Sequence, residues 1–199
     1  MDGDVRVCFV GDSFVAGVGD SDFLGWAGRV AAATSGDVAL TVYNLGVRRQ
    51  TSSEIRSRWL AECVQRLPEE SDGRVVFSFG TNDTTVEHGA PRVDPDVSVQ
   101  NLVVMLRECA AIGWPVLVVG PPPIGDIEQN ARTAELSARF ADVCASVGVE
   151  YVPVFDALAA DAVWMQQVRD GDGAHPDRGG YRALAALVRP VWERWTPAR

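Results

Sequence analysis

The stretch "VCFVGDSFVAG", residues 7–17, sets the interpretation of the whole sequence. An apolar, β-rich run ends at Gly11, and Asp12 and Ser13 follow before a second run of small and apolar residues. A serine at such a point can be a turn residue, a helix cap or a nucleophile. A nucleophilic serine needs a base within hydrogen-bond reach, so the histidines of the chain decide among these interpretations.

The alternation of a β-rich run with a helical pattern continues along the chain. Apolar runs typical of strands cover 5–10, 38–45, 74–79, 115–120 and 149–154. Stretches with helical spacing lie near 24–35, 51–67, 96–112, 128–147 and 178–194. Continuous apolar strands separated by helices indicate a parallel sheet covered on both faces, because a half-exposed strand would alternate polar and apolar residues. No linker or repeat divides the chain, so we expect one α/β domain over 1–199.

Two of the predicted helices have recognisable start signals. Thr51 followed by Glu54 forms a capping box, in which each side chain accepts a hydrogen bond from the other residue's backbone. Asp94 followed by Pro95 supplies a capping side chain and a proline for the first turn. Both signals support helices between the predicted strands.

Composition and charge narrow the class of partner. The formal net charge is −9, which disfavours binding to nucleic acid or to anionic lipid surfaces. No apolar stretch approaches the ~20 residues of a membrane span, and the acidic first residues lack the cations of a signal peptide. We therefore expect a cytoplasmic protein without stable membrane association. Widely spaced cysteines, expected to be buried free thiols in a reducing compartment, occur at Cys8, Cys63, Cys109 and Cys144. The sequence leaves the oligomeric state open.

The chain has two histidines, and one of them is suitably placed to act as a base. His175 lies in "DGDGAHPDRGGY", residues 170–181, three residues after Asp172. A glycine-containing turn can fold this carboxylate onto Nδ1 of the ring and leave Nε2 for a serine. The alternative is an ordinary loop histidine near a helix cap. His88 has no acid at a useful spacing and is expected to line or cap a loop.

A calcium loop is a further interpretation of "DGDGAH", and the sequence argues against it. Ala174 stands where a third acidic ligand is needed, and no glutamate closes the loop. We expect no metal site.

Three candidates could stabilise an oxyanion near Ser13. They are the Ser13 backbone N–H, the Gly46 N–H in "YNLGVRRQTS" and the Asn82 side chain in "FSFGTND". Each follows a predicted strand, and the carboxyl ends of parallel strands meet at one edge of a sheet. Taken singly, Gly46 is a strand-end turn residue and Asn82 an Asx-turn residue.

Four segments, "FVGDSFVAG", "NLGV", "SFGTND" and "DGAHP", resemble the signature blocks of the SGNH hydrolases, the GDSL esterase/lipase superfamily. The resemblance implies a flavodoxin-like three-layer α/β/α fold with strand order 2-1-3-4-5. It also implies ester or acyl hydrolysis without a cofactor. Ser13 would be the nucleophile, His175 the general base and Asp172 its orienting acid, with Ser13, Gly46 and Asn82 forming the oxyanion hole. Phe14 replaces the leucine of the GDSL tetrapeptide, which bears on pocket shape alone.

The leading hypothesis is therefore a serine esterase that acts on a small-molecule ester through an acyl-enzyme. A lysophospholipase, a thioesterase or a carbohydrate O-acetyl esterase could use the same site. A non-catalytic small-molecule binding protein or an interaction module on a flavodoxin-like fold is the alternative of another class. The loops at 84–96, 121–130 and 163–170 are expected to form the pocket. Its candidate residues are Phe14, Val47, Arg48, Val86, Ile124 and Trp164, with Arg48 as an anion contact.

Overall fold

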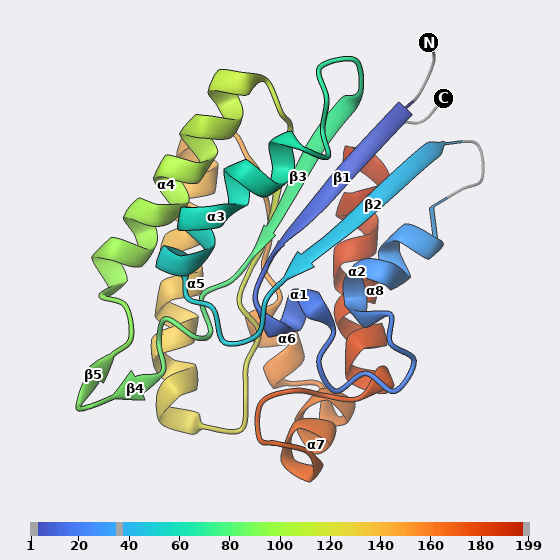
Figure 1. The fold of residues 1–199 in the computed structure, drawn as a ribbon. Coiled ribbons are helices and arrows are strands. Elements are labelled where there is room, and N and C mark those ends of the chain that lie inside the picture. The colour runs from blue at the N-terminus through green and yellow to red at the C-terminus, as the bar shows by residue number, and fades with distance from the viewer. Residues whose placement is uncertain (1–3, 35–37, 197–199) are drawn as a thin grey trace.

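The computed structural model describes residues 4–34 and 38–196 and contains a central parallel sheet. The strands of this sheet are β1 (Asp4–Gly11), β2 (Ala39–Gly46), β3 (Asp72–Ser78), β6 (Val116–Val119) and β7 (Glu150–Val152). They lie in the order β2-β1-β3-β6-β7, and every neighbouring pair is parallel. Counted along the chain, this is the order 2-1-3-4-5, so the predicted sheet is confirmed. Figure 1 shows β2, β1 and β3 side by side.

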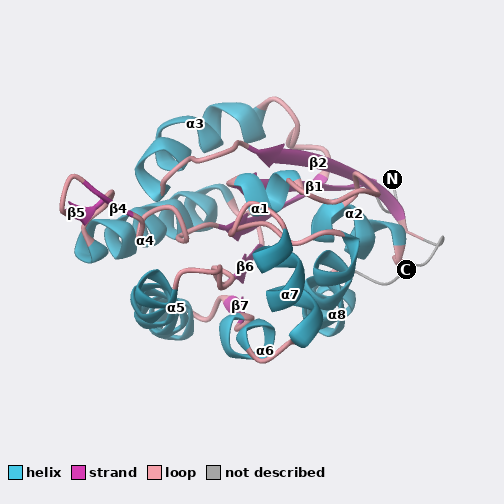
Figure 2. Cartoon of the chain, turned by 90° about the horizontal axis from the view of Figure 1, so that it is seen from below, coloured by secondary structure: helices cyan, strands magenta, loops and turns pink. Residues whose placement is uncertain are grey.

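Helices cover both faces of the sheet because β1 sends alternate side chains to opposite sides. Val7 and Phe9 belong to one buried cluster, and Cys8 and Val10 belong to the other. The first cluster is covered by α2 (Gly25–Ala32), α6 (Phe155–Ala159), α7 (Ala162–Asp170) and α8 (Arg178–Trp195). The second is covered by α3 (Ser52–Val64), α4 (Pro95–Ile112) and α5 (Ile127–Val147). Figure 2 shows these three layers, which confirm the predicted α/β/α architecture.

The sequence signals at two helix starts are confirmed. Thr51 and Glu54 form the complete capping box at α3. The Asp94 side chain accepts a hydrogen bond from the Asp96 N–H at the start of α4, where Pro95 occupies the first turn. These caps satisfy backbone donors that a helix leaves without partners in its first turn.

The predicted pocket loops contain regular structure, and a short helix follows β1. A four-residue helix, α1 (Ser13–Ala16), follows β1, and the predicted loop 84–96 contains a hairpin of β4 (Val86–Glu87) and β5 (Ala90–Pro91). The predicted pocket loop 163–170 is the helix α7, because Trp164 and Val168 lie one turn apart and are both fully buried. The predicted helix at 24–35 ends at Ala32, and residue 35 lies outside the described residues.

The four cysteines are buried and free, as the sequence predicts. None of the helices among the described residues combines the length and the apolar character that crossing a membrane requires.

Candidate active site

The short helix α1 follows the carboxyl end of β1 (Figure 1). Ser13 is its first residue, and two glycines allow this segment to pack tightly on the sheet. A Cβ atom added to Gly11 would lie 2.0 Å from the carbonyl oxygen of Ser78 on β3. One added to Gly46 on β2 would lie 2.2 Å from the backbone nitrogen of Ala16 in α1. The side chain of Asp12 caps α1 by accepting a hydrogen bond from Phe14 N–H at 3.0 Å. The serine is thereby fixed at the edge of the sheet.

His175 links Ser13 to Asp172 through two short contacts. Its Nε2 lies 2.8 Å from Ser13 Oγ, and its Nδ1 lies 2.8 Å from Asp172 Oδ2. The other carboxylate oxygen of Asp172, Oδ1, accepts hydrogen bonds from the backbone N–H groups of Ala174 and His175, and these bonds close the turn. This relay can move a proton from the serine hydroxyl to the imidazole while the carboxylate holds the ring in one tautomer.

The carboxyl group of Asp172 is ionised at neutral pH. Partial burial raises its pKa, but the hydrogen bonds from His175 and Ala174 outweigh burial and lower the pKa to about 2. The pKa of Asp12 shifts in the opposite direction. Complete burial raises this pKa to about 7, although hydrogen bonds from Phe14 N–H and the Asn82 side chain favour the charged form of Asp12. Asp172 is therefore the permanent negative partner of His175, and Asp12 is a structural carboxyl beneath the serine.

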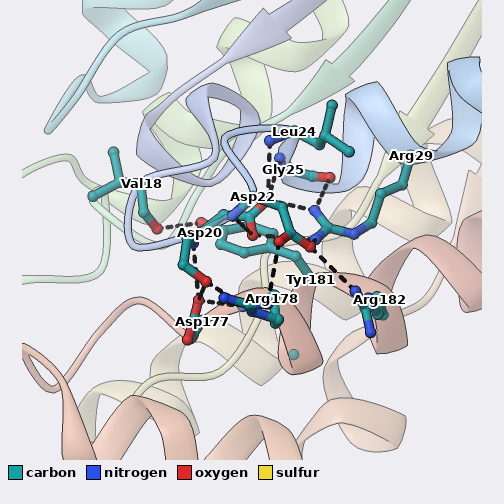
Figure 3. Close-up of polar contacts among 12 residues, drawn as sticks. Val18, Asp20, Asp22, Leu24, Gly25, Arg29, Asp177, Arg178, Tyr181 and Arg182 are labelled. Carbon is teal, nitrogen blue, oxygen red and sulfur yellow. Dashed lines mark hydrogen bonds and ion pairs between the residues drawn. The ribbon is translucent and has the colours of Figure 1, made fainter.

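A buried ion pair orders the loop that follows α1 (Figure 3). Asp20 is buried, pairs with Arg29 of α2 and accepts a hydrogen bond from Gly25 N–H. Burial raises the pKa of Asp20, but the Arg29 guanidinium and the backbone donors lower it to about 2. Tyr181 of α8 donates its hydroxyl to the carbonyl oxygen of Val18 in the same loop at 2.7 Å. The loop is therefore tied to two helices.

The same loop packs against the segment that carries His175. The Ser21 hydroxyl donates to Asp177 Oδ1 at 2.6 Å, just before α8. A Cβ atom on Gly19 would lie 2.8 Å from the carbonyl oxygen of Pro176 and 3.2 Å from Cβ of His175. The sequence did not point to this support, since it joins segments about 150 residues apart.

The oxyanion candidates do not all reach the same place. Asn82 lines a cavity beside Ser13, and its amide donates to Gln50 O at 3.1 Å and to Asp12 Oδ2 at 3.2 Å. Gly46 does not line this cavity, and its N–H donates to Asn44 Oδ1 at 3.0 Å. The Gly46 N–H therefore has a partner on its own strand in the free protein, and its part in the oxyanion hole stays a prediction. A glycine is also needed at this position because α1 packs onto it.

The cavity beside Ser13 has a volume of about 300 Å³. Its lining residues are Ser13, Phe14, Arg48, Arg49, Thr81, Asn82, Thr85, Glu87, Arg92, Ile124, Gln129, Ala174 and His175. A larger hollow of about 760 Å³ lies at the amino ends of β3 and β6, and none of the candidate site residues lines it.

Three of the six predicted pocket residues, Phe14, Arg48 and Ile124, line the cavity. Val47 and Val86 are exposed and do not line it. Trp164 does not line it either, because this side chain is fully buried in the core.

Trp164 stacks on Phe14 with ring centroids 6.2 Å apart, and its Nε1 donates to Pro123 O at 3.0 Å. It supports the cavity wall from behind. His88 is exposed at the turn between β4 and β5, with a φ of 56°, and lies outside the lining.

Sequence reasoning missed Arg49 and Arg92 in the cavity wall. Arg49 has a φ of 64°, a left-handed conformation that glycine usually occupies. An arginine at such a position gives no turn signal. Arg92 follows the β4–β5 hairpin, which the sequence did not predict, so no local pattern indicated its place.

A family model, described as the GDSL-like Lipase/Acylhydrolase family, matches residues 9–183 and so includes Ser13, Asp172 and His175. The chain belongs to this family. As a member of this family, the protein is a hydrolase of the acylhydrolase type. A comparison with curated protein sequences gives no significant match.

Solved structures share the fold of this GDSL-like chain over its full length. A lipase/acylhydrolase from Enterococcus faecalis is 24% identical, with a TM-score of 0.77, and the match covers 98% of this chain and 99% of that one. An acetylxylan esterase from Geobacillus stearothermophilus is 18% identical, with a TM-score of 0.78 and coverage of 99% and 98%. Solved catalytic mutants of that esterase replace a serine, an aspartate or a histidine by alanine.

Proposed function

We propose that this protein is a serine esterase that hydrolyses small carboxylic esters through an acyl-enzyme on Ser13. The observation that carries the proposal is the continuous relay from Ser13 through His175 to Asp172, with both contacts at 2.8 Å. A structural serine and a loop histidine do not require this arrangement. The family match over residues 9–183 supports acyl hydrolysis as the reaction class.

In the first half of the reaction, Ser13 Oγ attacks the ester carbonyl while His175 Nε2 takes the hydroxyl proton. The tetrahedral intermediate collapses as His175 returns that proton to the leaving alcohol, which leaves an acyl group on Ser13. In the second half, water attacks the acyl-enzyme, His175 takes a proton from the water, and the acid leaves as Ser13 recovers its proton. Asp172 stays charged throughout and stabilises the imidazolium.

In this proposal the oxyanion is stabilised by the Ser13 N–H, the Gly46 N–H and the Asn82 side-chain amide. Asn82 donates to Gln50 and Asp12 in the free protein, so one of its two N–H groups must turn toward the substrate. Donors of this kind act mainly when the carbonyl oxygen carries charge.

The modest cavity supports a small ester over a long-chain lipid. Phe14 and Ile124 are the two large apolar residues in its lining, and most of the other lining residues are polar or charged. A long acyl chain needs an extended apolar trough to bury its methylene groups.

The proposal is tested with an organophosphonate that reacts with activated serines. Intact-mass measurement should show one adduct on the wild type and none on Ser13→Ala, with circular dichroism verifying that the variant is folded. Turnover of p-nitrophenyl acetate should fall by roughly 10⁴ to 10⁶ in both Ser13→Ala and His175→Ala. An unmodified wild type, or a folded Ser13→Ala that keeps more than about a few per cent of kcat, would contradict the proposal.

A further inference from the structure

Three arginines in the cavity wall have no part in the proposed reaction. They are Arg48, Arg49 and Arg92, and among the described lining residues Glu87 is the single carboxylate that faces them. The fixed side-chain charges of this lining are therefore three positive and one negative, in a protein whose formal net charge is −9. A positive wall on an acidic protein favours the binding of an anion at this place.

Two of the three guanidinium groups are already engaged by the protein. Arg49 Nη2 lies 3.2 Å from Glu87 Oε1. Arg92 Nε lies 3.7 Å from the same oxygen, and its Nη2 lies 3.6 Å from Glu54 Oε2. Arg92 also donates to the backbone carbonyl of Arg49 at 2.8 Å. These contacts hold the arginine-rich turn against the β4–β5 hairpin, so Arg49 and Arg92 build the wall.

Arg48 is different because it is exposed and lines the cavity without a partner. Across residues 4–34 and 38–196, its side chain makes no ion pair and no hydrogen bond. The left-handed backbone of Arg49, with a φ of 64°, lies in the turn that brings both arginines to the cavity wall. A non-glycine residue in this conformation is unfavourable and persists where the surrounding structure enforces it.

We propose that Arg48 binds a carboxylate carried by the substrate, so that the enzyme prefers anionic esters to neutral ones. This inference rests on the proposed esterase function. The planar guanidinium offers paired N–H donors that match the two oxygens of a carboxylate. The cavity that holds Ser13 and His175 also holds Arg48, so an ester attached to Ser13 lies within the same 300 Å³ space.

The test compares pairs of esters that differ mainly in charge. p-Acetoxybenzoate and p-acetoxybenzamide carry the same acetyl group, and the charge lies on the leaving alcohol. Mono-p-nitrophenyl glutarate and p-nitrophenyl pentanoate share a leaving group and chain length, and the charge lies on the acyl side. The kcat/KM ratio of the anionic to the neutral ester is measured in the wild type, Arg48→Gln and Arg107→Gln, after subtraction of the uncatalysed rate. Comparing ratios between enzymes cancels the intrinsic reactivity of each ester.

Arg107→Gln is the matched control because Arg107 is exposed on α4, lies outside the cavity lining and changes the net charge equally. In at least one ester pair, the ratio should fall about 5- to 20-fold in Arg48→Gln and stay unchanged in Arg107→Gln. The lower kcat/KM of Arg48→Gln on the anionic ester should come mainly from a higher KM, since the carboxylate lies away from the reacting carbonyl. High salt should reduce the wild-type ratio.

Ratios within about twofold of the wild type for Arg48→Gln in both pairs would overturn the inference, and so would an equal loss in Arg107→Gln. Failure of the esterase proposal itself gives a different result: the wild type turns over none of the four esters, or Ser13→Ala turns them over as well as the wild type does.

Discussion

Replacing Asp172 by Asn tests the relay without removing the turn that carries it. Asp172 Oδ1 accepts two backbone N–H groups, from Ala174 and His175, and Oδ2 faces His175 Nδ1 at 2.8 Å. Asn keeps an oxygen for the backbone donors and places an NH₂ group opposite Nδ1. The ring must then present an unprotonated Nδ1 and carry its proton on Nε2, toward Ser13. In that tautomer His175 cannot accept the serine proton.

The expected loss follows from the contacts that change. The wild type has the full benefit of a charged partner at neutral pH, because the pKa of Asp172 is lowered to about 2. A charge-assisted hydrogen bond contributes about 1.5 to 3 kcal/mol, and restoring the productive tautomer adds to this cost. The Asp172 side chain is 53% exposed, so in the variant water supplies part of the stabilisation that the carboxylate gives to the imidazolium. We expect kcat to fall by roughly 10² to 10³, equivalent to about 3 to 4 kcal/mol.

The assay is steady-state hydrolysis of p-nitrophenyl acetate near pH 7.5, with unfolding followed by circular dichroism. KM and the unfolding midpoint of Asp172→Asn should stay close to the wild-type values, because the turn keeps its acceptor. Asp172→Ala is the control: it should lose a similar amount of kcat and also lower the midpoint, since two backbone donors lose their partner. A folded Asp172→Asn that keeps more than about a tenth of wild-type kcat would refute the tautomer argument.

Four further outcomes are expected. Asn82→Ala should lower kcat by roughly 10² to 10³ with a smaller change in KM, and a purely KM effect would make Asn82 a wall residue only. Gly46→Ala should lower the free energy of unfolding, measured in urea, by about 3 kcal/mol, because its Cβ meets the backbone of Ala16; wild-type stability would show that α1 can move. Asp20 has its pKa lowered to about 2, so the stability advantage of the wild type over Asp20→Asn should be complete above the unfolded pKa and be lost as the pH falls from about 4 to about 2; a constant difference over that range would contradict the shift. On p-nitrophenyl esters, kcat/KM should peak between acetate and about hexanoate, whereas an optimum at decanoate would reveal an apolar channel.

The sequence alone determined the architecture and the local part of the site. Strand and helix patterns depend on residues close together in the chain, so the alternation of apolar runs and helical spacing was enough to predict a covered parallel sheet. The pairing of Asp172 with His175 was accessible for the same reason, because three residues of a glycine-containing turn bring the two side chains together. The placement of Ser13 at a strand end likewise followed from the motif around it.

Only the tertiary structure decided which side chains surround the serine. Gly46 and Arg49 lie three residues apart, yet they meet different surroundings. Gly46 packs so closely against α1 that no side chain fits there. Arg49 lies in a left-handed turn that brings it to the cavity wall. Trp164 was expected in the pocket, but the amphipathic helix α7 turns it into the core. The contact between Arg49 and Arg92 joins a turn to a hairpin about forty residues away. Such contacts depend on how distant segments pack and on backbone conformations that the residue type does not announce, so no local pattern could indicate them.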